Sequence, residues 1–175
     1  MSEHDDTHVD VDGDGDWDEH WIHENPDGSV DVLADMNHDG HADFIGHDYD
    51  RDGLIDSSEY DKNYDGRFET HMSDSNHNGW QDHEVADRND DGRVDLYGRD
   101  TDEDGFFDQV VTDNNYNGTF DTVYADRNLD EHFDLVGHDS NENGTLDQVF
   151  TDSDYDGTFD TVSYPDPTTN PFVVH

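Results

Sequence analysis

Residues 100–112, Asp-Thr-Asp-Glu-Asp-Gly-Phe-Phe-Asp-Gln-Val-Val-Thr, contain the pattern that determines the fold of this chain. Acids stand at positions 1, 3, 5 and 9 of this stretch, and Gly105 stands at position 6. Glycine at that place allows the backbone to turn sharply. The last four residues, Gln-Val-Val-Thr, are rich in the β-branched side chains that favour strands. We therefore predict a tight acidic loop followed by a short strand.

The pattern recurs along almost the whole chain, and each copy is called a repeat below. Twelve repeats begin at Asp10, His23, Asp35, Asp48, Asp61, Asp74, Asp87, Asp100, Asp113, Asp126, Asp139 and Asp152. Every step is 13 residues except the step from His23 to Asp35, which is 12. We expect a lead-in over residues 1–9, a single elongated domain over residues 10–164, and a Pro-rich tail with a short apolar strand over residues 165–175.

Four positions of the repeat contain the acids. Position 1 is Asp except at His23, position 9 is Asp except at Glu69, and positions 3 and 5 are always Asp or Asn. Like charges in register repel each other, so this arrangement indicates a compensating cation. The candidate metal ligands are Asp10, Asp12, Asp14, Asp18, Asn25, Asp27, Asp31, Asp35, Asn37, Asp39, Asp43, Asp48, Asp50, Asp52, Asp56, Asp61, Asn63, Asp65, Glu69, Asp74, Asn76, Asn78, Asp82, Asp87, Asn89, Asp91, Asp95, Asp100, Asp102, Asp104, Asp108, Asp113, Asn115, Asn117, Asp121, Asp126, Asn128, Asp130, Asp134, Asp139, Asn141, Asn143, Asp147, Asp152, Asp154, Asp156 and Asp160.

The spacing of these ligands suits calcium. Ca²⁺ takes six to eight oxygen ligands at about 2.3–2.6 Å, and alternate residues of a tight loop direct side-chain oxygens to one centre. We expect up to about twelve Ca²⁺ ions, one for each repeat. The repeats at Asp48, Asp100 and Asp152 have four acids and should bind best. We expect weak or empty sites in the repeat at His23, which lacks its first carboxylate, and in the repeat at Asp126, where Glu131 replaces glycine.

Segments 35–46 and 87–98, Asp-Met-Asn-His-Asp-Gly-His-Ala-Asp-Phe-Ile-Gly and Asp-Arg-Asn-Asp-Asp-Gly-Arg-Val-Asp-Leu-Tyr-Gly, carry a family resemblance. They resemble the calcium loops of FG-GAP repeats, in which the loop joins two short strands. The same loop is similar to those of thrombospondin type 3 repeats and to the first part of an EF-hand loop. The resemblance covers the loops only, and it implies calcium binding. Calcium-driven ordering of such an array would resemble the behaviour of RTX repeats.

The residues between the loops predict the architecture. Position 8 is apolar in eleven repeats, and helix-forming runs are absent. We predict an all-β, elongated rod of short strands held together by calcium, with an antiparallel meander favoured over a β-solenoid. A second periodicity of 52 and then 39 residues relates three sets of residues and favours duplication of larger blocks. These sets are Ala34, Ala86 and Ala125; Gly46, Gly98 and Gly137; and Tyr64, Tyr116 and Tyr155.

Composition excludes several function classes. The 175 residues include 49 acidic and seven basic side chains, with a net charge of −42 and an apolar content of 29%. Such a chain lacks the apolar surface to fold unaided. Seven basic residues are too few to bind the phosphates of a nucleic acid, and no apolar stretch is long enough to span a membrane. No cysteine is present, so disulfides cannot stabilise the fold. We expect no enzymatic activity, because the carboxylates are committed to metal and no convergent pocket is expected.

Two function hypotheses of different classes remain. The first is a structural protein at the cell surface or outside the cell, a rod or fibre subunit that folds on calcium loading. Phe172-Val-Val-His at the C-terminus would either cap the sheet or add to the next copy to build a homopolymer. The alternative is a high-capacity calcium buffer or an acidic modulator of mineral growth. No classical secretory signal is visible at the N-terminus, so an extracellular location requires a removed leader or another export route; otherwise the protein is intracellular.

Overall fold

The computed structural model describes residues 11, 15, 17–169 and 171. Its described residues form strands, turns and loops, with no helix, and so contain no helix that could cross a membrane. Two compact units make up the chain, Met1–Gly79 and Trp80–His175. Asp10, Asp12 and Asp14 of the first repeat lie outside the described residues, as does the segment Phe172–His175.

The unit Met1–Gly79 contains five strands, each following an acidic or turn segment. They are β1 (Glu19–Glu24), β2 (Val30–Asp35), β3 (Phe44–Asp48), β4 (Ser57–Tyr60) and β5 (Thr70–Ser73). Each strand pairs antiparallel with the next one in sequence, for example through Phe44 opposite Tyr60 in β3 and β4. The rings of these two residues pack with their centroids 4.9 Å apart.

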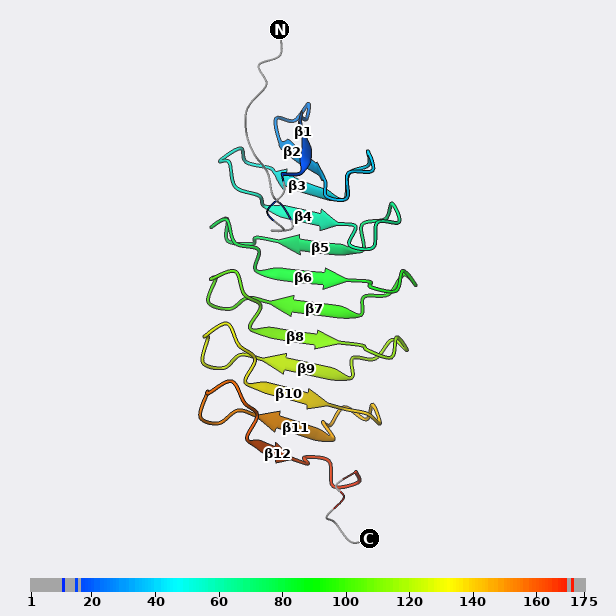
Figure 1. Ribbon diagram of the computed structural model, residues 1–175, viewed down its shortest axis with the longest axis vertical. Coiled ribbons are helices and arrows are strands. Elements are labelled where there is room, and N and C mark those ends of the chain that lie inside the picture. Colours follow the sequence, from blue (N-terminus) through cyan, green and yellow to red (C-terminus); the bar gives the residue numbers. More distant parts are fainter. Residues whose placement is uncertain (1–10, 12–14, 16, 170, 172–175) are drawn as a thin grey trace. The chain divides into compact units, whose positions relative to one another are not determined.

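The unit Trp80–His175 repeats the arrangement with seven strands (Figure 1). They are β6 (His83–Ala86), β7 (Leu96–Arg99), β8 (Gln109–Thr112), β9 (Thr122–Ala125), β10 (Leu135–His138), β11 (Gln148–Thr151) and β12 (Thr161–Ser163). Neighbours in sequence are again antiparallel partners. Because the described strands of each unit follow chain order with antiparallel neighbours, the meander is confirmed within each unit and the solenoid is excluded.

Chain reversal after every strand places consecutive loops at opposite edges. In the unit Trp80–His175, the loops that start at Asp87, Asp113 and Asp139 share one edge, and those that start at Asp100, Asp126 and Asp152 share the other (Figure 1). Loops on the same edge are joined by a backbone hydrogen bond, as when Asp126 N donates to Asp108 O at 2.8 Å. The position-1 residue of one loop therefore contacts the position-9 residue of the loop two repeats earlier.

The interior of the described chain is dominated by carboxylates. Its buried apolar side chains are Ala34, Phe44, Ala86 and Val149. In contrast, eighteen acids from positions 1 and 9 are buried. They are Asp18, Asp35, Asp43, Asp48, Asp56, Asp61, Glu69, Asp74, Asp82, Asp95, Asp100, Asp108, Asp113, Asp126, Asp134, Asp139, Asp147 and Asp152. Apolar burial alone therefore cannot account for the stability of this fold.

Candidate metal centres

Each loop is built around the carboxylate at position 1. In loop 100–108, Asp100 accepts the N–H of Glu103 at 2.7 Å and the N–H of Gly105 at 2.8 Å. Both donors have positive φ, 67° and 95°, and this left-handed backbone turns their N–H groups toward the carboxylate. The bond from the position-6 glycine recurs in eight further loops, those that begin at Asp35, Asp48, Asp61, Asp74, Asp87, Asp113, Asp139 and Asp152.

The carboxylate at position 9 is fixed from the other end of the loop. Asp108 Oδ2 accepts the N–H of Thr101 at 2.6 Å and also the hydroxyl of Thr101. The equivalent bond from position 2 to position 9 occurs in the loops that begin at Asp35, Asp48, Asp61, Asp87, Asp113, Asp126, Asp139 and Asp152. The carboxylates at positions 1 and 9, eight residues apart in sequence, are thereby held in one small space.

Three loops bring a third carboxylate to this pair. Asp48 with Asp50 and Asp56, Asp100 with Asp102 and Asp108, and Asp152 with Asp154 and Asp160 each present three oxygens within 4.8 Å of one another. These three loops are the described ones with an acid at all four ligand positions. Within the described residues, no other group of three acids or histidines is drawn together so closely. The structure thus singles out the same loops as the sequence.

The position-5 residues have a different place in the structure. Asp104 Oδ1 accepts the N–H of Phe106 at 2.9 Å, two residues further on, and so supports the turn. Asp52 and Asp156 accept the corresponding N–H groups of Leu54 and Thr158. The triads therefore consist of positions 1, 3 and 9, and one oxygen of the position-5 carboxylate supports the turn.

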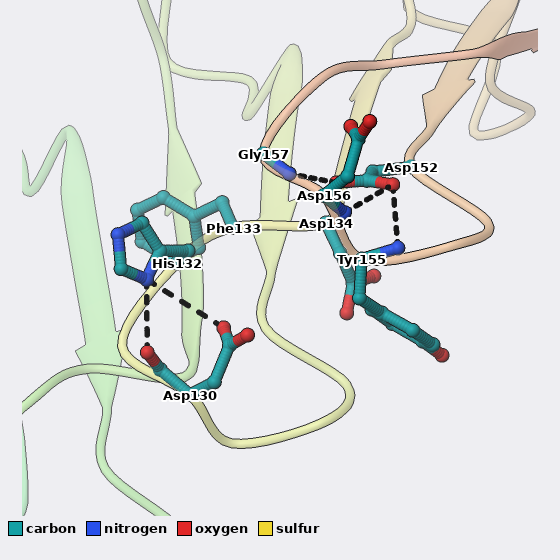
Figure 2. Close-up of a pocket in the computed structure, with 8 residues that line it drawn as sticks. All are labelled: Asp130, His132, Phe133, Asp134, Asp152, Tyr155, Asp156 and Gly157. Atoms are coloured by element: carbon teal, nitrogen blue, oxygen red, sulfur yellow. Dashed lines mark hydrogen bonds and ion pairs between the residues drawn. The ribbon is translucent and has the colours of Figure 1, made fainter.

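Carboxylates in the triads perturb one another's ionisation. Desolvation, followed by the charges of Asp104, Asp108 and Asp100, raises the pKa of Asp102. The charge of Asp156, then desolvation and two further carboxylates, raises the pKa of Asp154. Desolvation acts to raise the pKa of Asp152 as well, but N–H donors from Gly157, Tyr155 and Asp156 lower it overall (Figure 2). A bound cation would relieve the repulsion that raises the first two values.

Figure 2 shows the space between two loops of the same edge. A cavity of about 170 Å³ is lined by residues of the loops at Asp126 and Asp152, four of which are carboxylates: Asp130, Asp134, Asp152 and Asp156. His132 is hydrogen-bonded to the carbonyl of Asp130 at 2.9 Å, which raises the pKa of His132. The negative lining makes this space favourable for cations and unfavourable for anions.

Basic side chains reach several position-9 carboxylates, of which the sequence indicated only a pairing of His47 with a neighbouring carboxylate. His47 is hydrogen-bonded to Asp31 at 2.8 Å, and Asp56 is hydrogen-bonded to His77 of the loop at Asp74. Asp82 pairs with the adjacent His83. Asp56 raises the pKa of His77 by hydrogen bonding and by its charge. The pairing of His77 with Asp56 depends on which loops share an edge, so only the meander topology could have indicated it.

Asparagines in two loops hold a carboxylate from outside the loop. Asn115 and Asn117 donate side-chain N–H groups to Glu142. Asn141 and Asn143 donate to Asp166 at 3.1 and 2.6 Å. Asp166 lies in the segment predicted as the tail and is 2% exposed. The N–H and hydroxyl of Thr168, followed by the two amides, lower the pKa of Asp166 strongly.

The two repeats expected to be weak differ from the others. His23 lies within β1, and residues 25–29 form a tight turn in which Asn25 N donates to Ser29 O at 2.9 Å. Asn25 also donates its side-chain amide to Asp31 at 2.9 Å. In the repeat at Asp126, Glu131 has the positive φ, 68°, at the position where the other described repeats have glycine.

The residues present fit a cation, as one buried oxygen shows. Glu69 is 8% exposed; its Oε1 accepts the N–H of Lys62 at 2.7 Å, and its Oε2 is buried without a hydrogen-bond partner among the described residues. A buried carboxylate oxygen without a partner is costly, and a cation would satisfy it. The donor set of carboxylate and amide oxygens without sulfur is the set that Ca²⁺ prefers.

Comparison of this chain with protein-family models, with curated proteins and with solved structures finds no match. The functional case therefore rests on the residues and geometry described above.

Proposed function

We propose that this chain is a calcium-binding structural repeat protein that folds when its loops are loaded with Ca²⁺. The observation that carries the proposal is the burial of eighteen carboxylates at positions 1 and 9 in a described chain with four buried apolar residues. Carboxylates removed from water are strongly destabilising unless they are paired with positive charge. Seven Lys and Arg residues cannot supply that charge for 49 acids, so an external cation must.

Calcium is the cation that the donors favour. Three carboxylates within 4.8 Å, in each of three loops, provide the hard oxygen ligands of a calcium site, with backbone carbonyls available in the same turn. Loops of this kind in extracellular modules have modest affinities that are satisfied at the millimolar calcium level outside cells. We therefore propose an extracellular or cell-surface location and a structural role as a rod or fibre subunit.

The direct test changes one ligand of a triad. Asp108→Asn removes one of three clustered charges and should weaken calcium binding at loop 100–108 by on the order of tenfold. Glu103→Gln is the matched control, because Glu103 belongs to the same loop and is exposed, but lies outside the ligand positions. Calcium binding measured by equilibrium dialysis should show one weakened site in the first variant and none in the control. Equal binding by both variants would contradict the proposal.

A calcium buffer or an acidic modulator of mineral growth is the second candidate. Exposed acids at positions 3 and 5, such as Asp102 and Asp104, support it, because they could offer oxygens to ions of a mineral surface. Electron microscopy of the calcium-loaded protein separates the two candidates. Regular particles or filaments would favour the structural role, and their absence would favour the buffer.

We further propose that the segment at residues 172–175 adds to the sheet of a second copy. In the described chain, β12 pairs with β11 on one side only, and Val162 in β12 is 47% exposed. An open strand of this kind can accept another strand. Deletion of residues 170–175 preserves the contacts of Asp166 and should abolish polymers while calcium-induced folding persists. Polymers that survive this deletion would refute strand addition by this segment.

A further inference from the structure

Two loops of the unit Trp80–His175 contain an arginine at position 2, beside the position-1 aspartate. In loop 87–95, Arg88 N donates to Asp95 Oδ2 at 2.9 Å and Arg88 Nε donates to Asp95 Oδ1 at 2.5 Å. In loop 126–134, Arg127 forms the same two bonds with Asp134, also at 2.9 and 2.5 Å. Both oxygens of the position-9 carboxylate are therefore occupied by one residue of the same loop.

Loop 100–108 shows what the arginine replaces. There the position-2 residue is Thr101, and both of its donors reach Oδ2 of Asp108. No donor among the described residues reaches Asp108 Oδ1, and this carboxylate belongs to a triad. In loops 87–95 and 126–134, the arginine Nε donates to the equivalent Oδ1 of the position-9 carboxylate. The arginine therefore places a fixed positive charge at the carboxylate that a divalent ion would otherwise bind.

Further contacts hold the guanidinium of Arg88 in place. Its Nη2 lies 3.3 Å from both Asp95 O and Asp113 O, and its centre lies 5.6 Å from the ring centroid of Tyr116. Asp113 and Tyr116 belong to the next loop on the same edge. Arg88 therefore closes its own loop and also ties it to its neighbour. A guanidinium so placed would repel a divalent ion that entered the loop.

We propose that Arg88 and Arg127 are built-in counter-cations, so that loops 87–95 and 126–134 close without a divalent ion. The inference rests on the proposed calcium function, because it divides the loops into calcium-dependent and calcium-independent ones. The two loops lie at opposite edges of the unit Trp80–His175. Each edge thus has one loop that is ordered before calcium arrives and that can serve as a template for its neighbours.

Hydrogen–deuterium exchange of the full chain, with and without Ca²⁺, tests the proposal loop by loop. In chelator, loops 87–95 and 126–134 should exchange at least about tenfold more slowly than loop 100–108, the ratio expected for one charge-assisted bond. Arg88→Thr should make loop 87–95 exchange as fast as loop 100–108 in chelator, with protection restored by Ca²⁺. Arg93→Thr is the matched control. It removes the same charge from the same loop, and Arg93 forms no ion pair within the described residues.

The reciprocal variant introduces an arginine at position 2 of a loop that lacks one. Thr101→Arg should slow the exchange of loop 100–108 in chelator, whereas Thr101→Ser, which keeps the hydroxyl, should leave it fast. The proposal is overturned if wild-type loop 87–95 exchanges as fast as loop 100–108 in chelator, or if Arg88→Thr and Arg93→Thr behave alike. Failure of the calcium function itself would appear differently, as absence of calcium protection in wild-type loop 100–108.

Discussion

At the scale of single residues, aspartate suits positions 1 and 9 because its short side chain reaches N–H groups of its own loop. Asp100 accepts two such groups, and Asp108 accepts one together with a hydroxyl. These bonds orient the carboxylates but leave their charge uncompensated by any cation. Glu69, with a longer side chain, keeps one oxygen buried and without a partner. The same carboxylates thus shape the loop and create its demand for a cation.

Glu131 carries backbone strain that can be measured. Its φ of 68° is left-handed, which costs a non-glycine residue about 1–2 kcal/mol. Glu131→Gly should stabilise the calcium-loaded protein by up to about 1 kcal/mol, because the relief of strain is partly offset by the greater freedom of glycine in the unfolded chain. Glu131→Gln removes the charge but keeps the strain. Urea unfolding should rank Glu131→Gly above Glu131→Gln, and an equal ranking would show that the strain is unimportant.

Asp166 should make the attachment of the C-terminal segment sensitive to acid. Its pKa lies below the ordinary value of 3.8, so its contribution to stability is complete above that pH and is lost as the pH falls through the lower folded value. Asp166→Asn has no such titration. The amide exchange rate of Thr168 should differ between the wild type and Asp166→Asn. This difference should be largest near pH 6 and should become progressively smaller below about pH 4. A difference that stays constant down to pH 2 would contradict this assignment.

At the scale of elements, the glycines at position 12 of three repeats face bulky residues at position 8 of the following repeat. A Cβ atom on Gly46 would lie 3.0 Å from Ile55 Cδ1, and one on Gly137 would lie 2.7 Å from Leu146 Cδ1. Gly98 is less tightly enclosed, with Phe107 and Glu84 at 3.3 Å. The glycines of the second periodicity therefore lie where a strand accommodates a large side chain of the following repeat.

These spacings predict the effect of adding one methyl group to a strand. Gly137→Ala should destabilise the calcium-loaded protein by about 1–3 kcal/mol, the usual cost of overpacking, because Leu146 and Val123 both lie within 3.0 Å of the new atom. Gly98→Ala should cost less, since its nearest neighbours are further away. Thermal or urea unfolding measures both values. A neutral Gly137→Ala, or a larger effect at Gly98, would refute the packing argument.

Strands were the elements that sequence predicted best. The runs Gln-Val-Val-Thr, Thr-Val-Tyr-Ala and Gln-Val-Phe-Thr are β8, β9 and β11, because each begins directly after a position-9 aspartate and local preference suffices. The antiparallel meander, favoured over a solenoid from the sequence, is confirmed within each unit. A weak or empty metal site was predicted for the repeat at His23. The tight turn at residues 25–29 of that repeat was not predicted, because it depends on the pairing of Glu24 with Val30.

Contacts between loops could not be predicted in the same way. The bonds from Asn141 and Asn143 to Asp166 join residues more than twenty positions apart. The bonds of Arg88 to Asp95 and of Arg127 to Asp134 each lie within one loop, and the spacing of seven residues between positions 2 and 9 could have indicated them.

At the scale of the whole molecule, charge decides whether the chain folds. Its net charge of −42 favours an extended chain, and two of its seven basic residues are already bound in loops 87–95 and 126–134. On the proposed function, loops without such an arginine obtain positive charge from Ca²⁺ in solution. Stability should therefore depend on the concentration of free Ca²⁺ through mass action, since the ion binds the folded loops and has few preformed sites in the unfolded chain.

Far-ultraviolet circular dichroism during a calcium titration of chelator-stripped protein tests this central claim most directly. We predict a cooperative change from coil to β-structure in the millimolar range, with Mg²⁺ ineffective because it requires near-ideal octahedral geometry and dehydrates reluctantly. Light scattering recorded on the same sample reports any assembly that accompanies folding. A spectrum that does not change with calcium would contradict the account, since the buried carboxylates would then be accommodated without a cation.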